Sequence, residues 1–216
     1  MFEAKKRFGL QVLNYAVTSN HIHLLVVDTK PDVLAKSIQL IAGRTAQEFN
    51  QRKNRKGAFW EDRYHATAID RNEHLVRCLV YIDLNMVRTG VVKHPAEWEM
   101  NGYREIQNRP DRYAIIDRRC LMEACGFSDY QEFAVQYRNW VEDALKEGRS
   151  REGHWTESIA VGSSTFIKAM KAKMGCDAKG RHLDGQTDGA CFLREEAASY
   201  IASFAGKSEA LSSKNA

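Results

Sequence analysis

The segment from Leu10 to Asp28 constrains the fold of this chain most strongly. Residues 10–17 (LQVLNYAV) and 21–28 (HIHLLVVD) are both apolar and β-prone, and only the polar cluster Thr18-Ser19-Asn20 separates them. Such clusters form turns, and two β-prone runs joined by one are typical of an antiparallel hairpin. We therefore expect the core of this chain to be built on a sheet.

Helical patterns surround this predicted hairpin. Residues 3–8 indicate the last turn of a helix, with Gly9 as its C-cap. A helix is expected from Pro31-Asp32 to about Asn50, then a strand over residues 59–70, then a helix from about His74 to Arg88. This alternation predicts an α+β fold, with helices packed on one face of an antiparallel sheet.

Beyond Pro110 the pattern is mainly helical. Residues 116–147 and 156–174 are rich in helix formers, and Ser163-Ser164 forms an internal cap in the second stretch. Residues 175–189 are expected to form a loop and residues 192–204 a further helix. The predicted organisation is a domain over residues 1–109, a helical extension over 110–205 and a disordered tail over 206–216.

Charge and cysteine content narrow the classes of function. Residues 1–112 contain 18 Lys and Arg against 13 Asp and Glu, whereas the remainder contains 14 against 15, so any polyanion site is expected in the first half. Five cysteines without a CxxC pair argue against a disulfide framework or structural zinc. The lack of a signal-peptide pattern and of an apolar run near the ~18 residues of a membrane span favours a cytoplasmic protein with no membrane partner.

His21 and His23 carry the first chemical signal. Residues i and i+2 of a strand point to the same face, so the two imidazoles stand side by side. Neighbouring imidazoles on a rigid strand can supply two ligands to one divalent cation. For this pair taken alone, two ordinary histidines at the start of a strand are the commoner case.

The helix predicted over residues 74–88 carries the second signal. Tyr81 and Asn85 are four residues apart and belong to a polar stripe, opposite a core-facing side that includes Leu79 and Ile82. A phenol can act as an oxygen nucleophile, and an amide oxygen can bind a metal or a phosphate. An isolated tyrosine at a helix edge more often places its hydroxyl in water. The full stripe consists of His74, Arg77, Tyr81, Asn85 and Arg88.

The two signals together resemble the HUH single-tyrosine transposases, and within them the REP-associated, insertion-sequence-200-type group. The resemblance spans about residues 4–105 and is carried by three blocks: residues 15–26 (YAVTSNHIHLLV), 57–64 (GAFWEDRY) and 81–90 (YIDLNMVRTG). It implies a ferredoxin-like catalytic domain with a helical C-terminal extension.

The resemblance also implies a chemistry. His21 and His23 would bind Mg²⁺ or Mn²⁺, with Asn85 as a further ligand, and Tyr81 would be the nucleophile. Tyr81 would cleave single-stranded, hairpin-forming DNA and hold the 5′-phosphotyrosine link until the strand is rejoined. A homodimer is left open.

Basic and aromatic residues fit such a site. Arg63 and Arg88 flank it, and four cations of the loop at residues 51–57 are expected to contact phosphates, although a solvated loop explains them equally well. These four are Arg52, Lys53, Arg55 and Lys56. Phe59, Trp60 and Tyr64 can stack on unpaired bases, but Phe59 and Trp60 fit a core better. Arg44 and His65 show no preference between a surface and a DNA role.

The sequence departs from the family at two places. Members usually carry a first strand and most of a first helix before the point where this sequence begins, so a strand of the sheet interior is expected to be missing. Its neighbour would then need backbone partners from another element or a second copy. In addition, Met86 stands where a proline usually follows the asparagine, so Asn85 is held less firmly.

Two other functions remain open on the sequence. The first is a DNA-binding protein of the same fold that has lost strand transfer. The second is a metal phosphodiesterase that uses the two histidines with water and forms no protein–DNA adduct.

Overall fold

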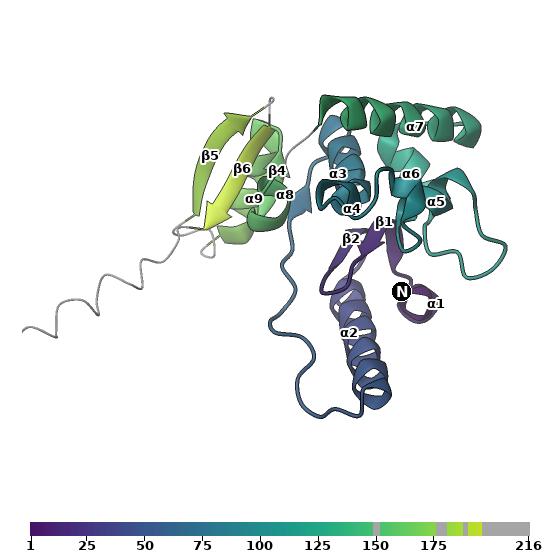
Figure 1. The fold of residues 1–216 in the computed structure, drawn as a ribbon. Coiled ribbons are helices and arrows are strands. Elements are labelled where there is room, and N and C mark those ends of the chain that lie inside the picture. The colour runs from purple at the N-terminus through teal and green to yellow at the C-terminus, as the bar shows by residue number, and fades with distance from the viewer. Residues whose placement is uncertain (149–151, 176–180, 188–189, 196–216) are drawn as a thin grey trace, which may run out of the picture.

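A computed structural model of the chain describes residues 1–148, 152–175, 181–187 and 190–195. Helices surround two small sheets, which confirms the predicted α+β class (Figure 1). The helices are α1 (Phe2–Phe8), α2 (Val33–Arg52), α3 (Glu73–Asp83), α4 (Asn85–Arg88), η1 (Pro95–Glu97), α5 (Gly102–Gln107), α6 (Arg118–Cys125), α7 (Tyr130–Glu147), α8 (His154–Glu157) and α9 (Ser164–Met174). The strands are β1 (Gln11–Val17), β2 (Ile22–Val27), β3 (Ala68–Ile69), β4 (Ala160–Gly162), β5 (Arg181–Thr187) and β6 (Ala190–Glu195).

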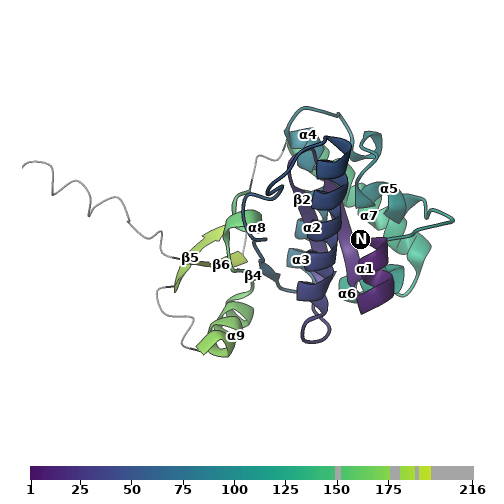
Figure 2. The same ribbon diagram turned by 90° about the horizontal axis from the view of Figure 1, so that it is seen from below.

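The first sheet is the predicted hairpin. β1 and β2 pair antiparallel, from Gln11 opposite Val27 to Val17 opposite Ile22. The left-handed Gly9, with φ of 73°, ends α1 as the sequence predicted and leads the chain into β1. The side chains of residues 12–16 are all buried, because α3, α5 and α6 pack against β1. Seen from below, α2 lies in front of β2 (Figure 2).

The outer edge of β1 is paired by segments from much later in the chain. The Asp117 N–H donates to the carbonyl of Val12 at 2.8 Å, and Val12 forms a bridge with Ile116. The Val17 N–H donates to the carbonyl of Met100, also at 2.8 Å. Residues on both sides of the predicted boundary at residue 109 therefore complete one sheet edge. Within the described residues, β2 pairs with β1 alone.

The second sheet has the strand order β3-β4-β6-β5 and contains a strand that was predicted differently. The strand expected over residues 59–70 is limited to Ala68–Ile69, which runs parallel to β4. Side-chain bonds to backbone hold the preceding residues in place of a ladder: Trp60 Nε1 donates to the Ala42 carbonyl at 3.0 Å and Thr67 Oγ1 to the Ser158 carbonyl at 2.6 Å.

The C-terminal extension is less helical than the sequence predicted. The expected loop at 175–189 contains β5, and the expected helix at 192–204 begins as β6, whose Leu193 carbonyl accepts the Ile159 N–H at 2.7 Å. A short apolar run does not distinguish strand from helix by periodicity, so pairing with β4 and β5 decides its conformation. The cap at Ser163 is confirmed, since its hydroxyl accepts the Phe166 N–H of α9 at 3.3 Å. Residues 196–204 and the predicted tail lie outside the described residues.

Candidate active site

The two histidines converge at the start of β2. The Nε2 atoms of His21 and His23 are 3.1 Å apart, and the ring centroids are 4.8 Å apart. The turn before the strand orients His21: Asn20 Oδ1 lies 2.8 Å and Thr18 Oγ1 3.0 Å from its Nδ1. Because the Asn20 oxygen can only accept, it favours the tautomer with the proton on Nδ1, which leaves a lone pair on Nε2.

His23 presents a second lone pair to the same point. The side-chain nitrogen of Asn85 lies 2.9 Å from its Nε2, and an amide nitrogen donates, so this Nε2 accepts. Burial, together with neighbouring His21 and Arg88, lowers the pKa of His23 to about 4, so the imidazole is neutral at pH 7. The Nε2 atoms of the two imidazoles thus face one another, and two ring nitrogens at one point can serve as ligands of a single divalent cation.

Asn85 completes this donor set. Its Oδ1 is buried and has no hydrogen-bond partner, although its Nδ2 contacts His23. A buried amide oxygen without a partner is costly, so the oxygen of an amide that contacts His23 fits a metal ligand. Two nitrogens and one oxygen suit a divalent cation and leave positions for phosphate oxygens. Met86 does not displace Asn85 from the histidines.

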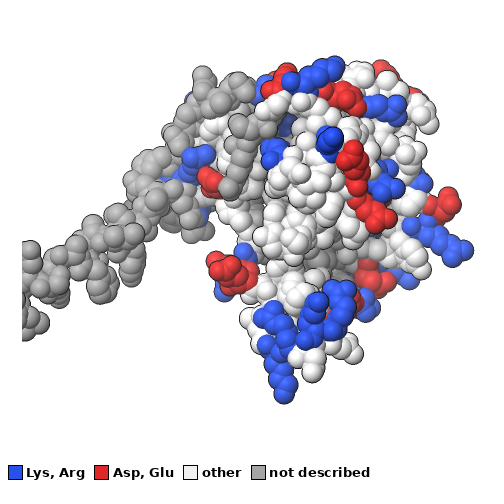
Figure 3. Space-filling view, viewed as in Figure 1, with Lys and Arg blue, Asp and Glu red and all other residues white. Residues whose placement is uncertain are grey.

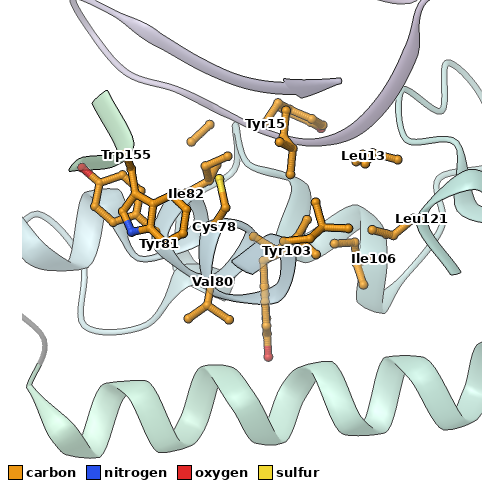
Figure 4. Close-up of a cluster of buried hydrophobic side chains, with 14 of the residues drawn as sticks. Leu13, Tyr15, Cys78, Val80, Tyr81, Ile82, Tyr103, Ile106, Leu121 and Trp155 are labelled. Atoms are coloured by element: carbon orange, nitrogen blue, oxygen red, sulfur yellow. The ribbon is translucent and has the colours of Figure 1, made fainter. Parts of the chain in front are cut away.

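The helix that carries Tyr81 and Asn85 is interrupted between them. The sequence predicted one helix over residues 74–88, whereas α3 ends at Asp83 and α4 begins at Asn85. The predicted polar stripe is also less exposed than expected. Tyr81 is only 7% exposed and Asn85 9%. Tyr81 packs against Trp155 of α8, with 6.2 Å between the ring centroids (Figure 4).

Tyr81 lies beside the histidines and an arginine. Its ring centroid is 6.2 Å from that of His23, and the Arg88 guanidinium carbon lies 4.0 Å from its ring centroid. Burial lowers the pKa of Arg88, while Tyr81 and Glu152 act in the opposite direction. A phenol, two imidazoles, an amide group and a guanidinium are therefore brought together at one end of the core.

The predicted DNA-contacting cations fall into two groups. Arg63 and Arg88 line the same open hollow of 1710 Å³ as His21, His23 and Tyr81. The four cations of the loop, by contrast, lie exposed at the C-terminal end of α2 and form the blue tip at the bottom of Figure 3. These are Arg52, Lys53, Arg55 and Lys56. The structure thus places two cations beside the proposed site and four at a separate tip.

The aromatic residues of the 57–64 block divide as well. Phe59 packs against Phe49 of α2 and against Trp60, with ring centroids 4.6 and 4.8 Å apart. These two residues therefore belong to the packing of the loop on α2, whereas Tyr64 is 54% exposed. Arg44 is exposed, and His65 Nε2 lies 3.0 Å from the Ser158 carbonyl oxygen.

The sequence reasoning missed a buried polar cluster behind Tyr81. Asp83 is 1% exposed, and its carboxylate accepts hydrogen bonds from Asn14 and Tyr137. Burial raises the pKa of Asp83 to about 7, although these hydrogen bonds and the Tyr103 N–H lower it. Two signals were available: Asp83 follows Leu79 by four residues on the core-facing side of the helix, and Asn14 interrupts an apolar strand.

The family comparison covers this site. Residues 1–85 match the family model described as "Transposase IS200 like", and the match reaches from α1 to Asn85. It includes both histidines and Tyr81. The similarity to IS200-like transposases thus covers residues 1–85 of the 216. The IS200-like segment indicates a role in DNA transposition and DNA as the partner. No curated protein and no solved structure matches the chain.

Two general properties of the molecule bear on the site. The described residues contain no cluster of three or more His, Cys, Asp or Glu that suits a metal ion. His21, His23 and Asn85 do not form such a cluster, because the third residue is an asparagine and not one of these four types. None of the helices in the described ranges is long and apolar enough to cross a membrane.

Proposed function

We propose that this protein is a metal-dependent transposase that cleaves and rejoins single-stranded, hairpin-forming DNA through Tyr81. One observation carries the proposal: the Nε2 atoms of His21 and His23 lie 3.1 Å apart, and His23 contacts both the Tyr81 ring and the amide of Asn85, whose oxygen has no partner. A structural histidine pair does not require a buried, unpartnered amide oxygen next to it.

His21 Nε2, His23 Nε2 and Asn85 Oδ1 would hold Mg²⁺ or Mn²⁺. The bound ion supplies Lewis acidity to the non-bridging oxygens of a phosphate. Asn20 keeps the His21 Nε2 lone pair available, and the low pKa of His23, about 4, keeps that imidazole neutral. His23 therefore needs to lose no proton to act as a ligand at neutral pH.

Tyr81 performs the covalent step. Its hydroxyl oxygen forms a bond to phosphorus, the bond from phosphorus to the DNA 3′ oxygen breaks, and the phenol proton ends on the departing 3′-hydroxyl. Rejoining is the reverse, with a DNA 3′-hydroxyl attacking the phosphotyrosine. Because the bond energy is retained, neither direction consumes water. The Arg88 guanidinium, 4.0 Å from the ring centroid, places positive charge beside the reacting phosphate.

The remaining cations bind the DNA. Arg63 lines the hollow around Tyr81, and Tyr64 beside it offers an exposed ring on which a base can stack. The four-cation tip would contact backbone phosphates outside the site, which gives affinity without sequence information.

The test is covalent adduct formation. The purified protein is incubated with Mn²⁺ and a labelled single-stranded hairpin from the DNA around its own coding sequence, and the products are separated by denaturing electrophoresis. We expect an adduct that disappears in Tyr81→Phe, because the phenol oxygen is the nucleophile. Tyr64→Phe is the matched control, because Tyr64 lines the same hollow. Loss of the Tyr64 hydroxyl should leave adduct formation unchanged.

Each failure has a distinct meaning. Metal-dependent cleavage without an adduct would replace the proposal with a phosphodiesterase that uses water. An adduct that persists in Tyr81→Phe would assign the chemistry to another residue.

A second candidate is a DNA-binding protein without strand transfer. The burial of Tyr81 favours it, since the side chain lies against Trp155, His23 and Arg88 and the residue is 7% exposed. This candidate predicts that the hairpin binds equally well to the native protein and to Tyr81→Phe, and that neither protein cleaves it.

A further inference from the structure

Asp83 is an acidic residue in the interior at the point where the site helix breaks. It is the last residue of α3, two residues after Tyr81 and two before Asn85, and it is 1% exposed. A buried carboxylate is tolerated only where donors surround it. Asn14 Nδ2 donates to Oδ1 at 3.0 Å, the Tyr137 hydroxyl donates to Oδ2 at 2.6 Å, and the Tyr103 N–H is a third donor.

These donors come from three separate elements. Asn14 lies on β1, Tyr103 at the start of α5 and Tyr137 in the middle of α7. Because each element has its own packing, the three donors define the position of Asp83 from three directions. A side chain fixed in this way cannot shift without loss of at least one buried hydrogen bond.

Asn14 is itself held in place. Its Nδ2 also donates to the Leu79 carbonyl of α3 at 3.1 Å, and its Oδ1 accepts the Tyr15 N–H at 2.8 Å. The backbone of Gly102 passes so close that a Cβ there would lie 1.9 Å from Asn14 Oδ1. The Asn14 amide therefore occupies a closely fitted space between β1, α3 and α5.

Asp83 and its three hydrogen-bond donors lie directly before the break between α3 and α4. Leu84, with ψ of 3°, separates α3 from α4, and Asn85 is the first residue of α4. The direction in which α4 leaves α3 determines where the Asn85 amide stands relative to Tyr81 and to His23 Nε2, 2.9 Å away. Asp83 is the last residue of α3 before this change of element.

We propose that Asp83 is a positioning residue. Held by Asn14, Tyr137 and the Tyr103 N–H, it fixes the position of Asn85, at the start of α4, relative to Tyr81. Because Tyr137 lies on α7, this helix takes part in the alignment of the site. The catalytic side of this inference rests on the proposed function. Tyr137 lies outside the matched family segment, so the alignment of the IS200-like site depends on residues beyond it.

The helix α7 offers a matched pair of variants for the test. Tyr137→Phe removes only the hydroxyl that donates a hydrogen bond to Asp83. Tyr130→Phe removes a hydroxyl on the same helix that donates to the Ile106 carbonyl at 2.5 Å and does not contact Asp83. Thermal unfolding of both variants establishes that each is folded.

The first readout is the rate of Tyr81–DNA adduct formation at varied Mn²⁺ and DNA concentrations. In Tyr137→Phe we expect the maximal rate to fall about tenfold, because small displacements of aligned groups cost rate steeply. DNA affinity should change less than about twofold, since Arg63 and the four cations of the tip lie outside α4. Tyr130→Phe should keep the native rate. Equal losses in the two variants, or no loss in Tyr137→Phe, would overturn the proposal.

A second readout does not depend on activity. The side-chain amide resonances of Asn85, assigned with Asn85→Ala, should shift in Tyr137→Phe and stay in place in Tyr130→Phe. If the native protein forms no adduct, the proposed function fails, while this spectrum still decides whether Asp83 positions Asn85. An Asn85 signal that is unchanged in Tyr137→Phe would overturn the positioning role even in an active enzyme.

Discussion

The two halves of the proposed site are held by partners at different distances along the chain. His21 is oriented by Thr18 and Asn20, three residues away or fewer. The Tyr81–Asn85 turn depends instead on Asp83, whose partners Asn14 and Tyr137 lie 69 and 54 residues away. The orientation of His21 needs only the turn before β2, whereas the arrangement of Tyr81 and Asn85 needs the complete core. Mutations should therefore separate local effects on metal binding from effects on the whole fold.

The largest expected effect comes from removing the long-range half. Tyr137 is fully buried, and its ring lies 5.6 Å from Phe133 between centroids. Tyr137→Ala should lower the free energy of unfolding by about 3–5 kcal/mol, because it leaves a cavity and Asp83 without a donor. Urea unfolding measures the change. Val135→Ala, on an exposed position of the same helix, should stay within about 0.5 kcal/mol. A loss below about 1 kcal/mol in Tyr137→Ala would contradict the comparison.

A smaller effect is expected where α5 meets the Asn14 amide. Gly102→Ala places a methyl group where Asn14 Oδ1 now stands, so the amide must move, at a cost of about 1–3 kcal/mol in the free energy of unfolding. Gly43→Ala is the control. No atom lies within 4 Å of a Cβ at Gly43 inside α2, and alanine should stabilise that helix by roughly 0.5–1 kcal/mol. If both variants are stabilised, Asn14 is not confined as described.

The local half should respond in metal affinity and not in stability. Asn20→Ala removes the acceptor that fixes the His21 tautomer, and loss of such a partner typically weakens metal binding by roughly tenfold or more. The free energy of unfolding should change by less than about 0.5 kcal/mol, because Asn20 is exposed. Titration with Mn²⁺ measures the first quantity and urea unfolding the second. Ser19→Ala, in the same turn, serves as the control, and a globally destabilised Asn20→Ala would remove the contrast between the halves.

The smallest effect on chemistry should follow from neutralising the four-cation tip. Replacing Arg52, Lys53, Arg55 and Lys56 by alanine should reduce the slope of log affinity against log salt by about 0.7 for each DNA phosphate that the tip neutralises. The adduct rate at saturating DNA should stay native, because the tip lies outside the hollow. A variant that lacks four exposed cations elsewhere (Lys93, Arg109, Arg112 and Lys146) controls for net charge. Equal salt slopes in the two variants would identify the tip as a solvated loop.

The contrast between local and long-range contacts also explains which features the sequence predicted. The hairpin, the Gly9 and Ser163 caps and the His21–His23 pair depend on neighbours within a few residues, so local patterns were sufficient. The short length of β3 and the strand conformation of β6 were not predictable, because both depend on pairing with β4. This strand lies about 90 residues from β3 and about 30 residues from β6. The proximity of Tyr81 and Asn85 to the histidines came from the family resemblance, since their spacing does not specify the partner strand.

Asp83 shows why the rest of the site escaped prediction. A lone aspartate on the core-facing side of a helix signals a buried partner but does not identify it. Asn14 and Tyr137 carry no motif, and only the fold brings them together. The domain boundary predicted at residue 109 stays a prediction, although the backbone hydrogen bond from Asp117 to Val12 crosses it.

The reach of that cluster has a consequence during synthesis of the protein. Asn14, Asp83 and Tyr137 leave the ribosome in that order, and the Asp83 carboxylate has no Tyr137 donor until most of α7 has emerged. The outer edge of β1 likewise waits for residues 100–117. Contacts this distant in sequence close late. The nascent IS200-like segment therefore completes its fold only after much of the following chain has been translated, and the candidate site reaches its final geometry late in synthesis.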